Sequence, residues 1–404
     1  MTSATTRRDL RTGRSLWADS PGLGVQTRPL EKAIAVDVAV VGAGISGAFM
    51  AHELARDHSV AVLDRRRPLM GSTIASTALL QWEIDLPLTT LSDRIGLARA
   101  RRAYRRSREA VRALEAIVTD EHIRCGLKPR RTLYLAGDDH GHRALEAEAE
   151  ARAAIGLESR YLAAADLRDA YGIERTGAIV SEGSASADPA RLAAGLLRRA
   201  IEQGARVWSP VEVEEAISDP EGVTLLTDAG HAVRARHVVF CCGYEFPKGV
   251  PTPGAKVVST WALASRERAA CPPWLRETLV WEASDPYLYF RMARDGRLIA
   301  GGEDEDSATA HEDGSRLKSK CQTIARKLSA LLPGLAFDVD YAWAGAFGES
   351  VTGLPQIGPV DGMDHVHAVM GFGGNGITYS VIASQVVGRA IRGRRDPDAD
   401  LYRP

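Results

Sequence analysis

The chain has 404 residues, of which 45% are hydrophobic and 25% are charged, and its formal net charge is −1. This length exceeds what one hydrophobic core usually supports, so we expect two domains. The near-neutral charge provides no overall field to attract nucleic acid or an anionic membrane. No stretch reaches the roughly 18 apolar residues that a membrane-spanning helix needs. We therefore expect a cytoplasmic monomer or small homo-oligomer that acts on a small molecule, with no nucleic-acid or membrane partner.

The five cysteines are scattered and form neither a CxxC pair nor a Cys/His cluster. This usage indicates free thiols in a reducing compartment and predicts no metal site. Residues 1–33 are polar and rich in Arg, Pro and Gly, and no apolar run follows Arg7-Arg8, so a twin-arginine export signal is excluded. We expect residues 1–33 to form an arm packed on the surface.

Residues 34–64 have the pattern of a strand, a glycine turn, a helix and a second strand. The turn reads "VGAGISG" over 41–47, after the strand-like "AIAVDVAV" and before "SVAVLD". Gly42 permits the tight turn, Gly44 lets a pyrophosphate approach the backbone, and Gly47 lets the helix lie close to the strand. The free N–H groups of the helix N-terminus favour phosphate. This context predicts a dinucleotide site.

The end of the second strand bears on which dinucleotide binds. Asp64 can accept hydrogen bonds from both ribose hydroxyls and would repel the 2′-phosphate of NADP. Arg65 and Arg66 follow it and could reverse that preference, although such a cluster is more typical of a solvated turn. This local motif leaves NAD and FAD open.

The next segment, "GSTIASTALLQWEID" over 71–85, does not continue as a second crossover. Its hydroxyl side chains suit hydrogen bonds to phosphate and ribitol oxygens, although they would equally cap a helix start. Residues 91–116 predict a long Arg-rich helix with a solvated face. The sequence of residues 143–170 also predicts a helical region.

The middle of the chain predicts a return to the first sheet and then a second sheet. Residues 187–208 read as a capped helix leading into a strand, and 237–242 as a buried strand that ends at Gly243. Val213 either lies near an adenine or belongs to the core. Residues 255–302 alternate like antiparallel strands.

One face of that second sheet carries Tyr287, Tyr289 and Arg291. Two aromatic rings and a cation would line a substrate pocket, but a solvated sheet face is an equal alternative. The acidic run "EDED" at 303–306 is expected to be a solvated turn.

A second glycine turn, "GFGGNGIT" over 371–378, lies between the strand-like "VHAVMG" and an amphipathic helix. It directs another helix N-terminus at a ligand. NAD has no need of this second site. A reduced flavin does, because its N1–C2=O region carries negative charge that a helix N-terminus stabilises.

The order of these pieces resembles the D-amino-acid oxidase superfamily of flavoproteins, which includes glycine oxidase, sarcosine oxidase and the γ-glutamylputrescine oxidase type. The resemblance covers about residues 36–400, and its more specific parts are "PYLYFR…DGRLIAGGE" and "GLPQIGPV…GFGGNGIT" in combination. It implies an extended FAD, with adenosine near Asp64, pyrophosphate at Gly42–Gly47 and isoalloxazine facing Gly373–Thr378. Residues 72–81 would run along the cofactor.

The resemblance also implies an α/β fold, in which a Rossmann-type FAD-binding domain is interleaved with an α+β substrate domain built on a mostly antiparallel sheet. We predict an N-terminal arm over 1–33. The FAD-binding domain would comprise 34–95, 185–250 and 335–404, and the substrate domain 96–184 and 251–334.

Two departures from the family pattern affect the expected substrate and acceptor. Amino-acid-oxidising members carry an Arg that pairs with the substrate carboxylate, and Phe347 takes that position here, so simple amino acids are disfavoured as substrates. Ile299 stands where sarcosine oxidase has a lysine near the flavin, which leaves oxidase and dehydrogenase open. No Cys or His stands where covalent flavin attachment is expected, so FAD should be non-covalent.

We therefore predict an FAD-dependent oxidoreductase that removes hydride from a C–H bond next to nitrogen, in an amine or amino-acid-like substrate. The alternatives are an NAD-dependent dehydrogenase and a flavin-binding protein without turnover. The candidate catalytic residues are Tyr287, Tyr289, Arg291, Phe347 and Asn375. The candidate cofactor-binding residues are Gly42, Gly44, Ile45, Ser46, Gly47, Asp64, Arg65, Arg66, Ser72, Thr73, Ser76, Thr77, Leu79, Gln81, Val213, Gly243, Gly345, Gly373, Gly374, Asn375, Gly376, Ile377 and Thr378.

Overall fold

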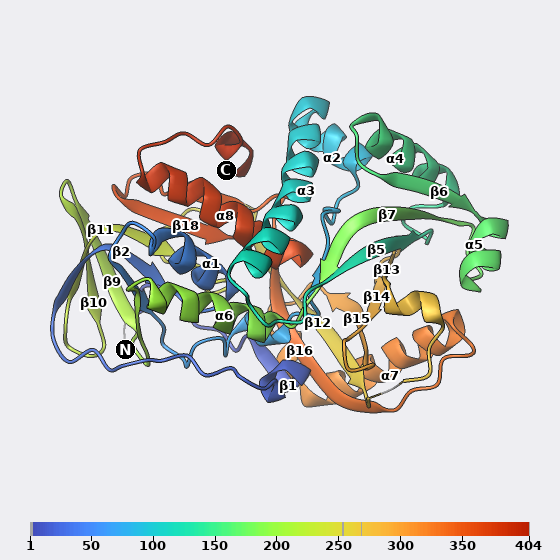
Figure 1. Ribbon diagram of the computed structural model, residues 1–404, viewed down its shortest axis with the longest axis horizontal. Helices are drawn as coiled ribbons and strands as arrows, with labels where there is room; N and C mark the ends of the chain where they lie inside the picture. The colour runs from blue at the N-terminus through green and yellow to red at the C-terminus, as the bar shows by residue number, and fades with distance from the viewer. Residues whose placement is uncertain (1–2, 253, 268, 404) are drawn as a thin grey trace.

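The computed structural model describes residues 3–252, 254–267 and 269–403, and these form two lobes built on two sheets (Figure 1). The first lobe holds an eight-stranded sheet with the order β17-β18-β11-β2-β3-β8, extended by β10 and β9. Its strands are β2 (Ile34–Val41), β3 (Val60–Leu63), β8 (Arg206–Trp208), β9 (Val213–Asp219), β10 (Gly222–Thr227), β11 (Val233–Phe240), β17 (Gln356–Pro359) and β18 (Val366–Met370).

The centre of this sheet is parallel, as the apolar strand sequences predict. β2 runs parallel to β3 and to β11, and β11 runs parallel to β18. Small and β-branched side chains make these strands suitable for burial on both faces. The helices α1 (Ile45–Leu54), α6 (Pro189–Glu202) and α8 (Gly376–Ile391) pack together beside the sheet (Figure 1). The carboxyl ends of β2 and β18 thus lead directly to the two glycine turns, and β3 ends beside Asp64.

The second lobe holds a ten-stranded sheet with the order β1-β16-β12-β15-β14-β13-β5-β7-β4, and β6 pairs with β7. It is antiparallel except where β13 pairs with β5. Its strands are β1 (Arg11–Arg14), β4 (Leu79–Leu80), β5 (Lys128–Leu135), β6 (Ser159–Ala163), β7 (Gly177–Ser186), β12 (Lys256–Ser265), β13 (Thr278–Glu282), β14 (Leu288–Met292), β15 (Leu298–Glu305) and β16 (Val339–Glu349). The mostly antiparallel second sheet is confirmed.

The remaining helices cover the second sheet and the junction between the lobes (Figure 1). They are α2 (Leu88–Ile95), α3 (Leu97–Asp120), α4 (His142–Ala154), α5 (Ala164–Tyr171) and α7 (Gly314–Leu331). Of the described residues, no helix is long and apolar enough to cross a membrane. β16 belongs to the second sheet, although the predicted domain division placed it with the cofactor domain.

Two helix predictions were wrong in detail. The Arg-rich helix expected over 91–116 is interrupted at Gly96, whose φ of 85° is unfavourable for other residues. Its basic face is largely solvated, as predicted, since Arg101, Arg105 and Arg112 are exposed, although Arg102 contacts Asp398 and Asp400 at 3.0 and 2.6 Å. The region 143–170 contains β6 between two helices.

The N-terminal arm is more than a surface segment. β1 forms the edge of the second sheet by pairing with β16, in the register Arg11↔Gly345. Trp17 is buried, and its Nε1 donates to the carbonyl oxygen of Ser76 at 2.6 Å. The expectation of an arm packed on the outside is therefore wrong, because this segment completes a sheet and part of the core.

Candidate cofactor and substrate site

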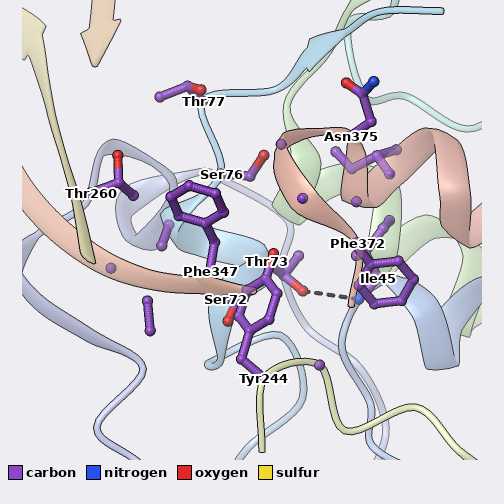
Figure 2. A pocket seen from close by; sticks show the side chains of 18 of the residues that line it. Ile45, Ser72, Thr73, Ser76, Thr77, Tyr244, Thr260, Phe347, Phe372 and Asn375 are labelled. Atoms are coloured by element: carbon purple, nitrogen blue, oxygen red, sulfur yellow. Dashed lines mark hydrogen bonds between the residues drawn. The ribbon is translucent and has the colours of Figure 1, made fainter. Parts of the chain in front are cut away.

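One cavity of about 610 Å³ is lined by residues of both lobes, and we call it the central cavity. Its lining includes both glycine turns, the segment 71–81, and side chains of the second sheet. Figure 2 shows labelled side chains from each of these parts around one space. Every candidate cofactor-binding residue except Gly47 lines the cavity, as do Tyr287, Tyr289, Phe347 and Asn375.

The N-terminal glycine turn leaves no room for side chains at two of its positions. A Cβ on Gly42, whose φ is 111°, would lie 2.4 Å from the carbonyl oxygen of Cys241. A Cβ on Gly47 would lie 1.8 Å from the carbonyl oxygen of Gly42. Gly47 therefore sets the close approach of α1 to β2, as its place in the motif predicts, while the cavity wall is formed by its neighbours.

The first turn of α1 directs backbone donors into the cavity wall. The Ile45 N–H donates to Thr73 Oγ1 at 2.9 Å, which joins the helix N-terminus to the 71–81 segment. Asp64 ends β3 and accepts from the N–H groups of Ala43 and Arg66 at 2.6 and 2.7 Å. Burial raises the pKa of Asp64 to about 6, and these backbone donors oppose that rise.

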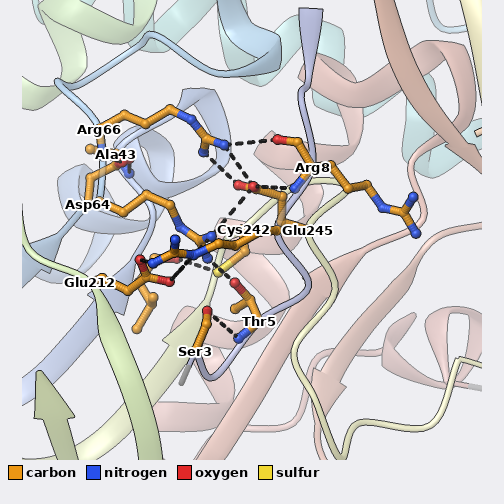
Figure 3. Close-up of polar contacts among 12 residues, drawn as sticks. Ser3, Thr5, Arg8, Ala43, Asp64, Arg66, Glu212, Cys242 and Glu245 are labelled. Atoms are coloured by element: carbon orange, nitrogen blue, oxygen red, sulfur yellow. Dashed lines mark hydrogen bonds and ion pairs between the residues drawn. The ribbon is translucent and has the colours of Figure 1, made fainter. Parts of the chain in front are cut away.

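Next to Asp64, two arginines are neutralised by buried glutamates (Figure 3). Arg66 contacts both carboxylate oxygens of Glu245 at 2.6 and 2.7 Å, and Glu245 is 3% exposed. Arg65 lies 3.4 Å from Glu212, which also pairs with Arg7. The basic cluster after β3 is thus neither a solvated turn nor a free anion site.

The second glycine turn meets the first at the cavity. Ser46 in α1 and Ser380 in α8 share a hydrogen bond of 2.8 Å between their hydroxyls. The Gly374 N–H donates to Asp85 Oδ2 at 2.7 Å, and a Cβ on Gly373 would lie 2.3 Å from that oxygen. The N-termini of α1 and α8 therefore face the same cavity, although 330 residues separate the two turns (Gly371 minus Val41).

The segment 81–85 holds the second turn in place. Asn375 Nδ2 donates to the carbonyl oxygen of Glu83 at 2.5 Å, and Thr378 Oγ1 donates to that of Gln81 at 2.9 Å. The Asn375 amide nitrogen is thus bound to the backbone, so this side chain fixes the turn. Burial raises the pKa of Asp85 to about 6.

The second sheet forms the opposite part of the lining. Tyr287 and Tyr289 have ring centroids 5.6 Å apart, and both rings line the cavity. A Cβ on Gly301 would lie 2.3 Å from the Tyr289 hydroxyl, so this glycine makes room for the ring. Thr260 on β12 and Phe347 on β16 lie on the same wall (Figure 2).

Two predictions about this sheet were wrong. Arg291 does not line the cavity: it is 2% exposed and donates to the carbonyl oxygens of Thr77 and Ala187 at 2.7 and 3.0 Å. Arg291 therefore links β14 to the segments around Thr77 and Ala187. The run 303–306 is not a solvated turn, because β15 continues to Glu305 and Asp304 lines the cavity.

Comparison with known proteins assigns the family. The family described as "FAD dependent oxidoreductase" (DAO) matches residues 37–390. The chain belongs to this FAD-dependent oxidoreductase family. It is 24% identical to gamma-glutamylputrescine oxidoreductase of Escherichia coli (strain K12), over 90% of this chain and 85% of that protein.

Solved structures show the same fold for this FAD-dependent oxidoreductase. Glycine oxidase from Geobacillus kaustophilus superposes with a TM-score of 0.76 at 22% identity, covering 90% of this chain and 96% of that one. L-proline dehydrogenase from P. horikoshii gives 0.77 at 18% identity, covering 93% and 98%. The family match makes FAD the cofactor and overturns the NAD alternative.

The residues of this FAD-dependent oxidoreductase fit the cofactor. The buried Ser72 Oγ and Gln81 Nε2 line the cavity and have no hydrogen-bond partner in the chain, so they are free for a polar ligand. No described histidine lines the cavity. Of the thiols, only those of Cys241 and Cys242 do, and burial raises both pKa values. Protonated thiols are poor nucleophiles, in keeping with non-covalent FAD.

Sequence reasoning missed several lining residues of this FAD-dependent oxidoreductase. Glu245 follows β11 at the same edge where Asp64 follows β3, so its position after a buried strand was a usable signal. Asp85 and Tyr244 lie in loops, and no pattern marked them. Thr260 and Asp304 flank an irregularity between β12 and β15, at Ser259 to Trp261, which shifts the alternation of side chains.

Proposed function

We propose that FAD occupies the central cavity with its pyrophosphate at Gly42–Ser46, its ribose at Asp64 and its isoalloxazine beside Gly373–Thr378. The single observation that supports this placement is the convergence of two glycine turns on one cavity, joined through Ser46 and Ser380 at 2.8 Å. Two helix N-termini can stabilise phosphate and an electron-rich ring. Residues 72–81 supply hydroxyl groups between them.

We further propose that the enzyme oxidises a C–H bond next to nitrogen. FAD, when bound, would supply the acceptor for the hydride and its electron pair. The substrate nitrogen releases a proton to water, the product is an imine, and water then hydrolyses it to a carbonyl compound and a free amine. The relatives named above support this chemistry, since their names refer to a putrescine derivative, glycine and proline.

The chain's own residues position the substrate and limit water. Tyr287, Tyr289 and Phe347 present aromatic surface on the wall formed by the second sheet. Burial, and then nearby Asp304, raise the pKa of Tyr287 well above its ordinary value, so this hydroxyl stays protonated and acts as a donor. Hydride removal requires no acid–base side chain beyond Tyr287, because the cofactor carries the redox chemistry.

Anaerobic reduction of the purified holoenzyme tests the reaction. We expect a panel of amines, imino acids and hydroxy acids to bleach the flavin absorbance only where the substrate has a C–H next to nitrogen. Bleaching by hydroxy acids instead would overturn the proposal, and no bleaching by any compound would favour a flavin-binding protein without turnover. Reoxidation in air then separates oxidase from dehydrogenase.

We also propose that this protein works in the cytoplasm as a monomer or small homo-oligomer. The five cysteines support a reducing compartment, because all are free thiols. Cell fractionation and mass measurement in solution test the two points.

A further inference from the structure

The lining of the central cavity is strongly acidic. Nine of its residues carry carboxylates, and only Arg65 and Arg66 carry cations. Both arginines lie beside Asp64 and are already engaged with Glu212 and Glu245. The carboxylates are Asp64, Glu83, Asp85, Asp139, Glu245, Glu282, Asp285, Asp304 and Glu349.

Away from Asp64, the lining therefore offers no cation to a negatively charged substrate. Phe347 occupies the sequence position where a carboxylate-binding arginine was expected, and Arg291 points into the protein instead. A substrate carboxylate in this region would meet like charge and would lose its water without gaining a partner. The lining disfavours α-amino acids.

Asp304 is a lining carboxylate whose oxygens are both buried and without a partner. Both carboxylate oxygens are buried and neither makes a hydrogen bond within the chain. Burial raises the pKa of Asp304, and the nearby Thr260 and Tyr287 hydroxyls oppose that rise without reaching hydrogen-bond geometry. Thr260 Oγ1 is itself buried without a partner. Such groups are rare in folded proteins, and a ligand that donates to them would satisfy both.

The other nearby acids are already occupied. Glu349 contacts Lys256 at 3.2 Å, and Asp85 accepts the Gly374 N–H at 2.7 Å. Beside Asp304, the Tyr287 and Tyr289 rings supply π faces suited to a cation. An unpaired carboxylate next to two aromatic rings is a site for an ammonium group.

We propose that the substrate is a diamine or polyamine, whose second, non-reacting ammonium group binds Asp304 between Tyr287 and Thr260. This inference rests on the proposed amine oxidation and assigns its substrate class. The bound cation belongs on a nitrogen other than the reacting one, because a neighbouring carboxylate favours the protonated amine. A protonated nitrogen has no lone pair to assist hydride loss from the adjacent carbon.

Matched substrates test the assignment on the holoenzyme. A straight-chain α,ω-diamine, the monoamine of equal length, and the ω-amino acid of equal length are compared by anaerobic stopped-flow flavin reduction. We expect the diamine to bind about 30-fold more tightly than the other two, the range expected for a buried charge pair. Equal binding of the three, or tighter binding of the amino acid, overturns the inference while leaving amine oxidation intact. If none of the three compounds reduces the flavin, the result contradicts the proposed amine oxidation itself rather than the assignment of its substrate class.

Two variants assign the preference to Asp304. Asp304→Asn should abolish the diamine preference with unchanged flavin content. Asp306→Asn is the matched control, since Asp306 belongs to the same acidic run but is 75% exposed and contacts Lys256 at 3.2 Å. The control should keep the preference. An Asp304→Asn enzyme that still prefers the diamine contradicts the assignment.

A binding measurement covers the case in which Asp304→Asn does not fold. A quaternary ammonium inhibitor and its neutral tert-butyl isostere are titrated into wild-type holoenzyme, and the visible flavin spectrum reports occupancy. We expect the cation to bind at least about 10-fold more tightly than the isostere. Equal affinity overturns the inference.

Discussion

At the Asp64 end of the central cavity, both oxygens of Glu245 are held by Arg66, and Glu212 is held by Arg65 and Arg7. At the opposite end, Asp304 has no such partner in the chain. Both ends are built from buried carboxylates, but only the first is closed by its own cations. A closed network gives a rigid wall for a resident cofactor, whereas an open carboxylate is available to a passing ligand. The predictions below test that contrast.

The largest effect is expected at the nucleotide end, from Gly47→Ala. A Cβ there would lie 1.8 Å from the carbonyl oxygen of Gly42, so the turn or α1 must shift. We expect a loss of about 3 kcal/mol in the free energy of unfolding and a protein almost free of flavin. Flavin absorbance per protein and chemical denaturation measure the two. Gly314→Ala, which meets nothing within 4 Å, is the control. Full flavin content in Gly47→Ala would show that the first turn is not the phosphate site.

Opening the closed network is expected to have the next largest effect. Arg66→Ala leaves Glu245 buried without its bidentate partner, which should lower the free energy of unfolding by about 2 kcal/mol. Denaturation of the holoenzyme measures the change. Arg67→Ala, an exposed neighbour, should change stability by less than about 0.5 kcal/mol. If Arg66→Ala and Arg67→Ala lowered the free energy of unfolding equally, the pairing of Arg66 with Glu245 would not stabilise the protein. The contrast between the paired Glu245 and the unpaired Asp304 would then fail.

Asp85 lies at the N-terminus of α8, where its carboxylate accepts a hydrogen bond from the Gly374 N–H. Its negative charge offsets the positive end of the helix dipole, so it disfavours an electron-rich ligand there. Asp85→Asn should raise the flavin midpoint potential by about 30 mV, measured by dye-coupled reduction. Asp93→Asn, exposed on α2, should leave the potential unchanged. A fall in the potential would place the isoalloxazine elsewhere.

The smallest effect concerns pH. Burial raises the pKa of Asp304 to about 6, above its value in the unfolded chain. The folded state then holds the proton more tightly, so this contribution to stability is complete below about pH 4 and is lost as pH rises through 6. The thermal midpoint should fall by about 2 °C over this range, and Asp304→Asn should flatten the dependence. An identical slope in both proteins would mean that Asp304 titrates normally.

The sequence predicted those parts of the site that rest on local backbone requirements. Gly42 and Gly47 are fixed by contacts with residues a few positions away or one strand over, and the motif encodes them. The parallel return of β11 followed from its apolar run. Asp304 and Arg291 were misplaced for a different reason. Their surroundings depend on how β14 and β15 pair and on a shift opposite Thr260, which no local pattern records.

Asp85 could not have been found by the same reasoning. It meets the second glycine turn 289 positions away, through a loop that has neither periodicity nor a motif. The pairing of the N-terminal arm with β16 was missed likewise, because it spans most of the chain.

The pairing of β1 with β16 affects the order in which parts of the protein fold. Arg11 is made more than three hundred residues before its partner Gly345. Closing so long a loop is slow, and native contacts of this range form late. Thr5 and Leu10 belong to the wall of the central cavity. During biosynthesis, that wall therefore stays open at least until Gly345 has been made, so the nucleotide can enter through it before β1 pairs with β16.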